Sequence, residues 1–294
     1  MSKFKSGFVN IVGNPNVGKS TLMNELVGER ISIITSKAQT TRHRIMGIVN
    51  GEDFQIVYSD TPGVLKPNYK LQESMLKFST SAIGDADIIL YVTDTVENIE
   101  KNLEFIEKVR ASEIPTIVVI NKIDLTTAEK LDDLVDKIKG LLPNAVIAPA
   151  SATNKFNIEN IFNLIIEKLP EGEAFYEKDA LTDKPMRFFV SEIVREKILL
   201  TYDKEVPYCV EVVVEDYKES PQIDKIRAII YVARDSQKGI IIGHKGNRLR
   251  EIGTKARLDL EEFLQKKVFL DLYVKVSSDW RDSEKALKNY GYIE

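Results

Sequence analysis

The sequence has little of the side-chain chemistry that marks secreted, redox or zinc proteins. Its 294 residues include one cysteine, Cys209, two histidines, His43 and His244, and one tryptophan. A single cysteine cannot form an internal disulfide bond, which favours a reducing cytoplasm. So few soft ligands also argue against a zinc site. We therefore expect a cytoplasmic protein without internal disulfides or zinc.

Long apolar runs and a strong net charge are also missing. Runs such as residues 117–120 have the length of a strand, far below the roughly 20 residues of a membrane helix. Residues 1–6 lead into the first apolar run without the long apolar segment of a secretion signal. The net charge is only -4, so nucleic-acid binding would depend on a local basic patch. We expect a soluble chain, and we leave peripheral association with the inner face of the cell membrane open.

The chain has the size and composition of two globular domains, with 43% hydrophobic and 29% charged residues. Up to about residue 169, apolar runs alternate with helical patterns, which predicts βαβ units around a mostly parallel six-stranded sheet. Strands are expected near 8–12, 44–49, 54–58, 87–92, 116–120 and 145–149, and helices near 20–27, 70–83, 99–110, 127–139 and 158–168. The dipeptide Asn50-Gly51 is a hairpin signal and predicts the one antiparallel pair.

A glycine-rich loop at residues 13–20 lies between the first strand and the first helix. Such a loop binds a triphosphate, because its glycines let main-chain N–H groups close around the phosphates and the helix start adds its positive dipole. Lys19 is expected to reach the β and γ oxygens, and Ser20 to offer its hydroxyl to Mg²⁺. The residues predicted to contact the nucleotide here are Gly13, Asn14, Pro15, Asn16, Val17, Gly18, Lys19, Ser20 and Thr21.

Two nearby segments predict further contacts to phosphate and metal. Residues 29–43 are rich in Ser, Thr and Lys without a sustained period, which predicts a mobile loop ordered by the γ-phosphate and Mg²⁺, or an ordinary surface connection. Asp60 directly follows the third strand, where an acid can hold Mg²⁺, and the Gly63 N–H can bond to the γ-phosphate. The alternative for this segment is a plain turn. Its predicted nucleotide contacts are Asp60, Thr61, Pro62, Gly63 and Val64.

The segments after the fifth and sixth strands predict guanine recognition. Ligands of an open α/β sheet lie outside the carboxyl ends of the strands, so these segments should meet the glycine loop at one rim. Asp124 can accept from guanine N1–H and from the exocyclic amine, whereas adenine has no donor at N1. Asn121 would tie the loops together, and the Lys122 stem would cover one face of the base. The main-chain N–H that would meet guanine O6 belongs to the Ser151-Ala152 segment, at Ala152.

Together these motifs resemble the Era family, within the translation-factor class of small GTPases. Residues 39–43 (Gln-Thr-Thr-Arg-His) also look like the first switch of that family. The resemblance implies slow intrinsic hydrolysis of GTP to GDP and phosphate, with a threonine hydroxyl coordinating Mg²⁺ in the GTP state. We expect Thr41 to be that ligand, with Thr40 as the alternative, beside Ser20 and Asp60. The predicted catalytic residues are Asn16, Lys19, Thr41, Asp60 and Gly63.

One position departs from Ras-like GTPases. Those enzymes place a glutamine after the glycine of the DxxG motif to orient the attacking water, and this chain has Val64, which has no hydrogen-bonding side chain. The Era-like class shares a hydrophobic residue there. Asn16 matches an asparagine that in some related GTPases helps to bind K⁺ beside the phosphates. K⁺ activation is therefore a hypothesis for this chain.

The order of the elements changes after residue 185. Residues 171–185 are polar, with a proline at each side, and predict a linker between a GTP-binding domain (1–170) and a second domain (186–294). In the second domain we expect helices near 187–200, 247–265 and 280–290, a short helix ending near 242, and strands near 208–215, 225–233 and 268–276. This order, αββααβ plus one helix, predicts an α+β domain.

A GxxG loop at residues 241–246 connects the two middle helices of the second domain. Such a loop lets phosphates approach closely, and the KH fold uses it to hold four nucleotides. Basic residues between 238 and 257 supply the local patch that the net charge hides. The predicted RNA contacts are Ile241, Ile242, Gly243, His244, Lys245, Gly246, Arg248, Arg250 and Lys255. Tyr273 and Trp280 could stack on bases, but we expect both to be packing residues.

The arrangement resembles the type II KH domain of the Era family. That resemblance implies binding to small-subunit ribosomal RNA near the 3′ end of 16S rRNA, and a role in assembling the 30S subunit. We therefore predict a GTPase switch whose nucleotide state is coupled to RNA binding. The alternatives are a nucleotide-stabilised RNA-binding adaptor with little turnover, which Val64 keeps open, and a kinase or ATPase, against which residues 121–124 argue.

Overall fold

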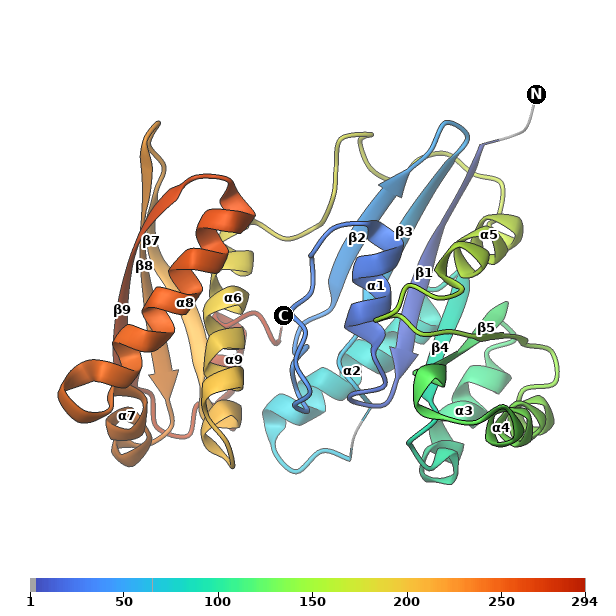
Figure 1. Cartoon of the computed structure of the whole chain (residues 1–294), viewed down its shortest axis with the longest axis horizontal. Coiled ribbons are helices and arrows are strands. Elements are labelled where there is room, and N and C mark those ends of the chain that lie inside the picture. Colours follow the sequence, from blue (N-terminus) through green and yellow to red (C-terminus); the bar gives the residue numbers. More distant parts are fainter. Residues whose placement is uncertain (1–3, 65, 294) are drawn as a thin grey trace. The chain divides into compact units, whose positions relative to one another are not determined.

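The computed structural model describes residues 4–64 and 66–293, and these divide into two compact units. Residues up to 67 and 75–183 form the first unit, and residues 68–74 and 184 onward form the second. Figure 1 shows both units as ribbons coloured along the chain. Within the described ranges, no helix is both long and apolar enough to span a membrane.

The first unit is built on a six-stranded sheet with the strand order β2-β3-β1-β4-β5-β6. Its strands are β1 (Lys5–Gly13), β2 (Ile45–Asn50), β3 (Phe54–Asp60), β4 (Ile88–Asp94), β5 (Thr116–Asn121) and β6 (Val146–Pro149). Only β2 and β3 pair in antiparallel register, around the Asn50-Gly51 turn, and the other four pairings are parallel. The predicted mostly parallel sheet and its single antiparallel hairpin are confirmed.

The connections of this sheet are helical, as the alternating pattern predicts. The helices are α1 (Lys19–Val27), α2 (Lys70–Gly84), α3 (Leu103–Ala111), α4 (Ala128–Leu141) and α5 (Ile158–Lys168). Residues 70–74 of α2 group with the second unit by their contacts. A short 3-10 helix, Ile99–Asn102, precedes α3, so the predicted helix 99–110 divides in two. Every residue of β4 and β5 is buried, which is typical of parallel strands covered on both faces. This rigid core holds the loops at the carboxyl ends of the strands.

The second unit packs helices on a three-stranded sheet with the order β7-β8-β9. Its elements are α6 (Met186–Thr201), β7 (Glu211–Lys218), β8 (Ile223–Val232), α7 (Asp235–Ile242), α8 (Asn247–Leu264), β9 (Lys267–Val276) and α9 (Glu284–Asn289). β7 and β8 are antiparallel, with an irregularity between Val214 and Asp216, whereas β8 and β9 are parallel. Buried side chains of α6, α8 and the sheet form its core. The predicted αββααβ order with one added helix is confirmed.

Two boundaries in the second unit differ from the prediction. β7 begins at Glu211 rather than near residue 208, because Val206–Cys209 forms a 3-10 helix that contains Pro207. The last helix begins at Glu284 rather than near residue 280, because the Ser283 side chain caps it by accepting from the Ala286 N–H. The preceding residues form turns instead.

The two aromatic residues that we expected to pack have different environments. Trp280 is fully buried, and its Nε1–H donates to the Cys209 carbonyl at 2.9 Å. Tyr273 is 47% exposed on β9, and the Arg227 guanidinium lies 5.8 Å from its ring centre. Packing of Trp280 is confirmed, whereas the prediction that Tyr273 packs in the core is wrong. The side chains of adjacent strand positions point to opposite faces of a sheet, and Tyr273 falls on the outer one.

The segment predicted as a linker lies along the edge strand of the first sheet. The Ile48 N–H donates to the Leu181 carbonyl at 2.8 Å, and the Met46 N–H donates to Asp183 Oδ1 at 2.9 Å. Further along, Gln55 Nε2 donates to the Tyr176 carbonyl at 2.8 Å. The first two bonds occupy backbone groups of β2 that an open sheet edge would expose. Residues 171–183 are therefore fixed to the first unit, to which they also belong by their contacts.

Candidate nucleotide site and nucleic-acid interface

The glycines of the 13–20 loop are required by its geometry. Gly18 has a φ of 95° and caps the start of α1, and a Cβ there would lie 2.2 Å from Asn121 Nδ2. Gly13 has a φ of 145°, and a Cβ there would meet the Val92 carbonyl oxygen at 2.1 Å. Only glycine fits both the backbone angle and the space at these positions. The loop is thus closely packed against the ends of two neighbouring strands.

Lys19 lies in the hollow of this loop. Its Nζ donates to the carbonyl oxygens of Gly13 and Asn14, at 3.1 and 2.7 Å. Burial lowers the pKa of the Lys19 ammonium to about 8, although the nearby carboxylates of Asp60 and Glu97 oppose the shift. The ammonium is therefore held, poorly solvated, at the point where phosphate oxygens would be expected.

Three oxygen-bearing side chains meet beside Lys19. Ser20 Oγ donates to Asp60 Oδ2 at 2.7 Å and lies 2.9 Å from Thr41 Oγ1, which is itself 3.4 Å from the same carboxylate oxygen. The other oxygen of Asp60, Oδ1, is buried and has no hydrogen-bond partner. Two hydroxyls and a carboxylate with an unused oxygen are the donor set that Mg²⁺ prefers. The residues present therefore fit a bound Mg²⁺.

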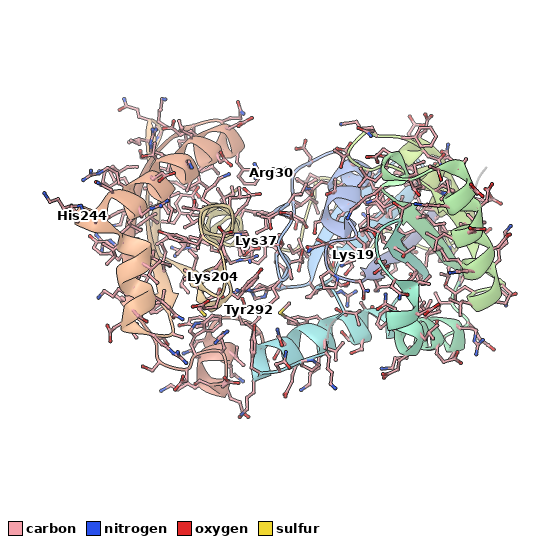
Figure 2. All side chains as sticks on the ribbon, turned by 60° about the horizontal axis from the view of Figure 1, so that its bottom comes forward. Lys19, Arg30, Lys37, Lys204, His244 and Tyr292 are labelled. Carbon is pink, nitrogen blue, oxygen red and sulfur yellow. The ribbon has the colours of Figure 1, made fainter. Side chains whose placement is uncertain are left out.

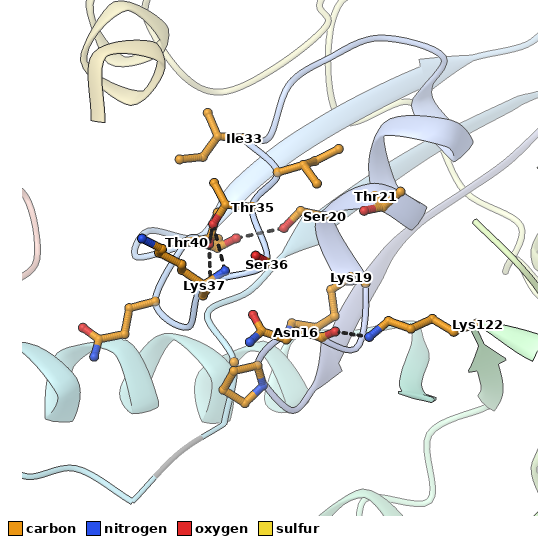
Figure 3. A pocket seen from close by; sticks show the side chains of 16 residues that line it. Asn16, Lys19, Ser20, Thr21, Ile33, Thr35, Ser36, Lys37, Thr40 and Lys122 are labelled. Carbon is orange, nitrogen blue, oxygen red and sulfur yellow. Dashed lines mark hydrogen bonds between the residues drawn. The ribbon is translucent and has the colours of Figure 1, made fainter. Parts of the chain in front are cut away.

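The structure separates Thr41 from Thr40. Thr40 Oγ1 donates to the Lys37 carbonyl at 2.6 Å and lies 2.6 Å from Thr35 Oγ1. Both threonines line a cavity of about 370 Å³, together with the glycine loop and residues 33–37 (Figure 3). Within that cavity, Thr41 faces Ser20, whereas Thr40 is engaged by its own loop.

The segments predicted to recognise guanine meet the glycine loop, as the sheet topology requires. The Asn121 side chain joins the glycine loop to the 151–152 segment. Its Nδ2 donates to the Val17 carbonyl and its Oδ1 accepts from the Ala152 N–H, both at 2.9 Å. Asp124 Oδ1 accepts from Ser151 Oγ at 2.6 Å. The predicted base-binding residues are thus brought together, and the side chain of Asn121 connects them to the phosphate loop.

Residues 61–64 pack against another side of the 13–20 loop. The Val64 N–H donates to the Gly13 carbonyl at 3.1 Å, and Thr61 Oγ1 donates to the Ile11 carbonyl at 2.7 Å. A Cβ on Gly63 would lie 2.5 to 2.6 Å from atoms of Pro15. Close approach of the two loops therefore requires glycine at position 63.

Two acids that the sequence analysis did not select are part of this site. Asp94 Oδ2 accepts from Lys122 Nζ at 2.5 Å, and the same ammonium donates to the Asn16 carbonyl at 2.5 Å. Glu97 Oε2 accepts from Asn14 Nδ2 at 2.6 Å. No motif marks these acids, and their position after a buried strand, as for Asp60, is the only signal that could have found them.

In the second unit, the GxxG loop forms the turn between α7 and α8. Gly243 and Gly246 have φ of 71° and 77°, and Gly246 caps the start of α8. His244 and Lys245 are exposed, and His244 projects outward from the turn (Figure 2). Ile241 is fully buried, so it supports the loop from the core rather than facing a ligand.

Beside this loop, α8 and β9 form a groove of about 330 Å³. It is lined by Gly246, Leu249, Arg250, Gly253, Thr254, Arg257, Leu270 and Leu272. Arg257 therefore lies in the groove, although it is not among the residues predicted to contact RNA. Lys255 instead lines a separate cavity with residues of α6, and its Nζ lies 2.8 Å from Glu251 Oε1. The helical period explains the difference, because positions 250, 253, 254 and 257 share one face and 255 does not.

Comparison with known proteins agrees with a GTPase domain in the first unit and a KH domain in the second. A family model described as a 50S ribosome-binding GTPase matches residues 8–122, and a KH-domain model matches residues 205–281. A solved structure of an Era variant from Aquifex aeolicus, bound to GDP and AlF4⁻, is 39% identical to this chain with a TM-score of 0.94, and the match covers 99% of this chain and 100% of that one. The chain belongs to the Era family.

A second similar solved structure is that of Era in complex with Mg-GDPNP and nucleotides 1506–1542 of 16S ribosomal RNA. It is also 39% identical, with a TM-score of 0.94, and the match covers 99% of this chain and 100% of that chain. This chain is therefore a GTPase that carries a KH domain. The family, the fold class and the enzymatic activity expected from the sequence are confirmed.

Proposed function

We propose that this GTPase is a nucleotide-dependent switch that binds the 3′ region of 16S rRNA and acts in assembly of the 30S ribosomal subunit. The observation that carries the proposal is that one chain contains both sites. Asn121 joins the phosphate loop to the base loops, and the second unit presents an open α8–β9 groove beside a GxxG turn. The family member solved with 16S rRNA nucleotides supports the choice of RNA.

In the nucleotide site, each cluster has a separate role. Lys19 and the N–H groups of the 13–20 loop would bind the phosphates, and Asp124 would select guanine. Ser20, Thr41 and Asp60 would hold Mg²⁺, which when bound neutralises the β- and γ-phosphate oxygens. The family member solved with Mg-GDPNP supports this metal. Thr41 is preferred over Thr40 because its hydroxyl already lies beside Ser20.

The attacking water needs orientation from groups other than the side chain of Val64. Asn16 is exposed in the phosphate loop, where its side-chain amide lines the cavity (Figure 3), and its carbonyl accepts from Lys122 Nζ. We propose that this amide helps to hold K⁺ beside the phosphates. Hydrolysis measured in potassium and in sodium tests this idea, and equal rates would rule it out.

The central experiment measures RNA affinity in two nucleotide states. An RNA that corresponds to the 16S 3′ end, and a scrambled RNA of equal length, are titrated into the chain loaded with GDPNP or with GDP. We expect tighter binding of the 16S RNA, and a difference between the two nucleotide states. Equal affinities for both RNAs would contradict the RNA partner, and equal affinities in both states would contradict the coupling.

Val64 favours one second candidate, an RNA-binding adaptor that uses nucleotide mainly for stability. Single-turnover hydrolysis with and without the 16S RNA separates the two proposals. A switch should hydrolyse GTP at a rate that the RNA changes, whereas an adaptor should show negligible hydrolysis in both conditions.

The cellular setting proposed for the switch is the cytoplasm, with peripheral association at the inner face of the cell membrane. Separation of cell extracts into soluble and membrane fractions, with and without a high-salt wash, tests both parts. We expect the chain in the soluble fraction, and any membrane-bound share to be released by salt.

A further inference from the structure

The loop that begins at the last residue of β4, residues 94–97, contacts the two functional loops of the nucleotide site. Asp94 is the last residue of β4, where it pairs in register with Asn121. Its side chain is only 5% exposed. Oδ1 accepts from the N–H groups of Val96 and Glu97, at 2.9 and 2.8 Å, and Oδ2 accepts from Lys122 Nζ. One buried carboxylate thus shapes its own turn and holds the lysine expected to cover the base.

Glu97 connects the same loop to the other side of the phosphate loop. Its carboxylate accepts from Asn14 Nδ2 at 2.6 Å, from Thr93 Oγ1 at 2.5 Å and from Asn102 Nδ2 at 3.3 Å. Through Lys122, the loop also reaches the Asn16 carbonyl. The 94–97 loop is therefore connected to the phosphate loop on both sides of Pro15.

The placement of these acids is electrostatically unfavourable for a site that binds a polyanion. A carboxylate near the phosphates lowers nucleotide affinity by repulsion, and burying it costs further solvation energy. Both costs are offset when the carboxylates fix groups that the nucleotide needs, and Glu97 also favours the charged form of Lys19. The partners observed are such groups, namely the Lys122 ammonium and the Asn14 amide within the phosphate loop.

We propose that Asp94 and Glu97 are positioning residues that fix the base-recognition loop and the phosphate loop at the separation a guanine nucleotide requires. The inference rests on the proposed nucleotide site. Asp94 acts through Lys122, and Glu97 acts through Asn14. Neither carboxylate is expected to touch the nucleotide.

The first test measures release of fluorescent mant-GDP by stopped flow from Asp94→Asn, Lys122→Met and the double variant. The Asn oxygen still accepts from the turn N–H groups, but the charge that holds Lys122 is lost. We expect release at least about tenfold faster in each single variant, as for the loss of a charged hydrogen bond, and little further increase in the double variant. Unchanged release in Asp94→Asn, or multiplying effects in the double variant, would overturn the role of Asp94.

A matched control is Asp87→Asn, because Asp87 directly precedes β4 and Asp94 is the last residue of the same strand. Asp87 Oδ2 accepts from the Phe8 N–H at 2.7 Å, away from the carboxyl ends of the strands. This change should lower thermal stability while mant-GDP release stays at the wild-type rate. If Asp87→Asn speeds release as much as Asp94→Asn does, the effect of Asp94 is general destabilisation and the inference fails.

Variants of Glu97 provide an independent test, which can be carried out even if the Asp94 variants fold poorly. Glu97→Gln keeps an oxygen that can accept from Asn14 and removes the negative charge, whereas Glu97→Ala removes both. We expect clearly weaker mant-GDP binding in Glu97→Ala and near wild-type binding in Glu97→Gln, because the lost charge reduces repulsion of the phosphates but also removes an interaction that favours the charged form of Lys19. Equal losses in both variants would contradict positioning by hydrogen bonding. If the wild-type chain itself binds no mant-GDP, the proposed nucleotide site fails, which is a different outcome from any of these.

Discussion

The molecule contains two glycine loops that begin a helix, and they differ in their surroundings. Gly18 precedes α1 and Gly246 precedes α8, both with positive φ. A Cβ on Gly18 would collide with Asn121, whereas a Cβ on Gly246 would have nothing within 4 Å. Lys19 is buried in the first loop, while His244 and Lys245 are exposed on the second.

The difference shows how one local motif can serve two kinds of phosphate ligand. An enclosed loop fixes every donor before binding, so it suits a small ligand that must be selected by its base and held for reaction. An open loop beside a groove lets a strand enter from either side, and its contacts are made one phosphate at a time. Changes in the enclosed loop should therefore have large effects, and changes beside the open one should have smaller effects that add together.

The largest effect is expected from Gly18→Ala. The new methyl group would displace the Asn121 amide and break its bonds to Val17 and Ala152, so GDP affinity should fall by about a hundredfold or more. Gly28→Ala is the matched control, because Gly28 has a φ of 82° at the other end of α1 with nothing within 4 Å of a Cβ. Titration with mant-GDP measures both variants. Similar losses in both would mean that backbone strain, rather than enclosure, sets the effect.

A second prediction concerns the oxygen cluster of the enclosed site. Thr41→Ala removes a hydroxyl that lies 2.9 Å from Ser20 Oγ, so the Mg²⁺ concentration needed for half-maximal hydrolysis should rise by about tenfold or more. Thr40→Ala removes the contacts of that hydroxyl with Lys37 and Thr35 within its own loop and should change this concentration little. Phosphate release over a Mg²⁺ titration distinguishes them, and the reverse order of effects would return the assignment to Thr40.

A third prediction uses pH to test the burial of Lys19. Its pKa of about 8 means that the ammonium is mostly protonated at pH 7 and only about a tenth protonated at pH 9. Since the phosphates need the charged form, affinity for GDP should fall about tenfold between these values. Isothermal titration at several pH values measures the fall. In Lys19→Arg the pH dependence should vanish, because a guanidinium stays charged, and a flat profile in the wild type would contradict the prediction.

The smallest effect is expected at the open groove. Arg257→Gln should weaken RNA binding roughly three- to fivefold and lower the slope of log affinity against log salt by about 0.7, the loss of one phosphate contact to a single strand. Lys255→Gln removes the same charge from the same helix, but Lys255 lies outside the groove. Salt titrations of both variants by fluorescence anisotropy decide the matter. Equal slopes would mean that RNA responds to overall charge rather than to the groove.

The parts of this site that could be predicted from sequence are those in which the order of neighbouring elements along the chain determines where they lie in the fold. A strand followed by a glycine loop and a helix can be built in few ways, and Asn50-Gly51 specifies its hairpin locally. The parallel topology then brings the loops after β1, β3, β5 and β6 together.

Other features depend on contacts that no local pattern encodes. Asp94 and Glu97 look like ordinary surface acids in a loop, and only the fold places them beside Lys122 and Asn14. Ser283, rather than Trp280, starts the last helix, because the indole is used in the core and donates to the Cys209 carbonyl. By contrast, the helical period of α8 could have predicted that Lys255 lies on a different face of the helix from the groove residues.

The buried indole of Trp280 has a practical consequence. It is the single tryptophan of the chain, it is shielded from water, and it belongs to the second unit. Its emission should shift to the red when that unit melts, and should not respond when the GTPase core alone loosens. The wild-type protein thus carries an optical reporter for its second unit, and the denaturation of that unit can be followed without any added label.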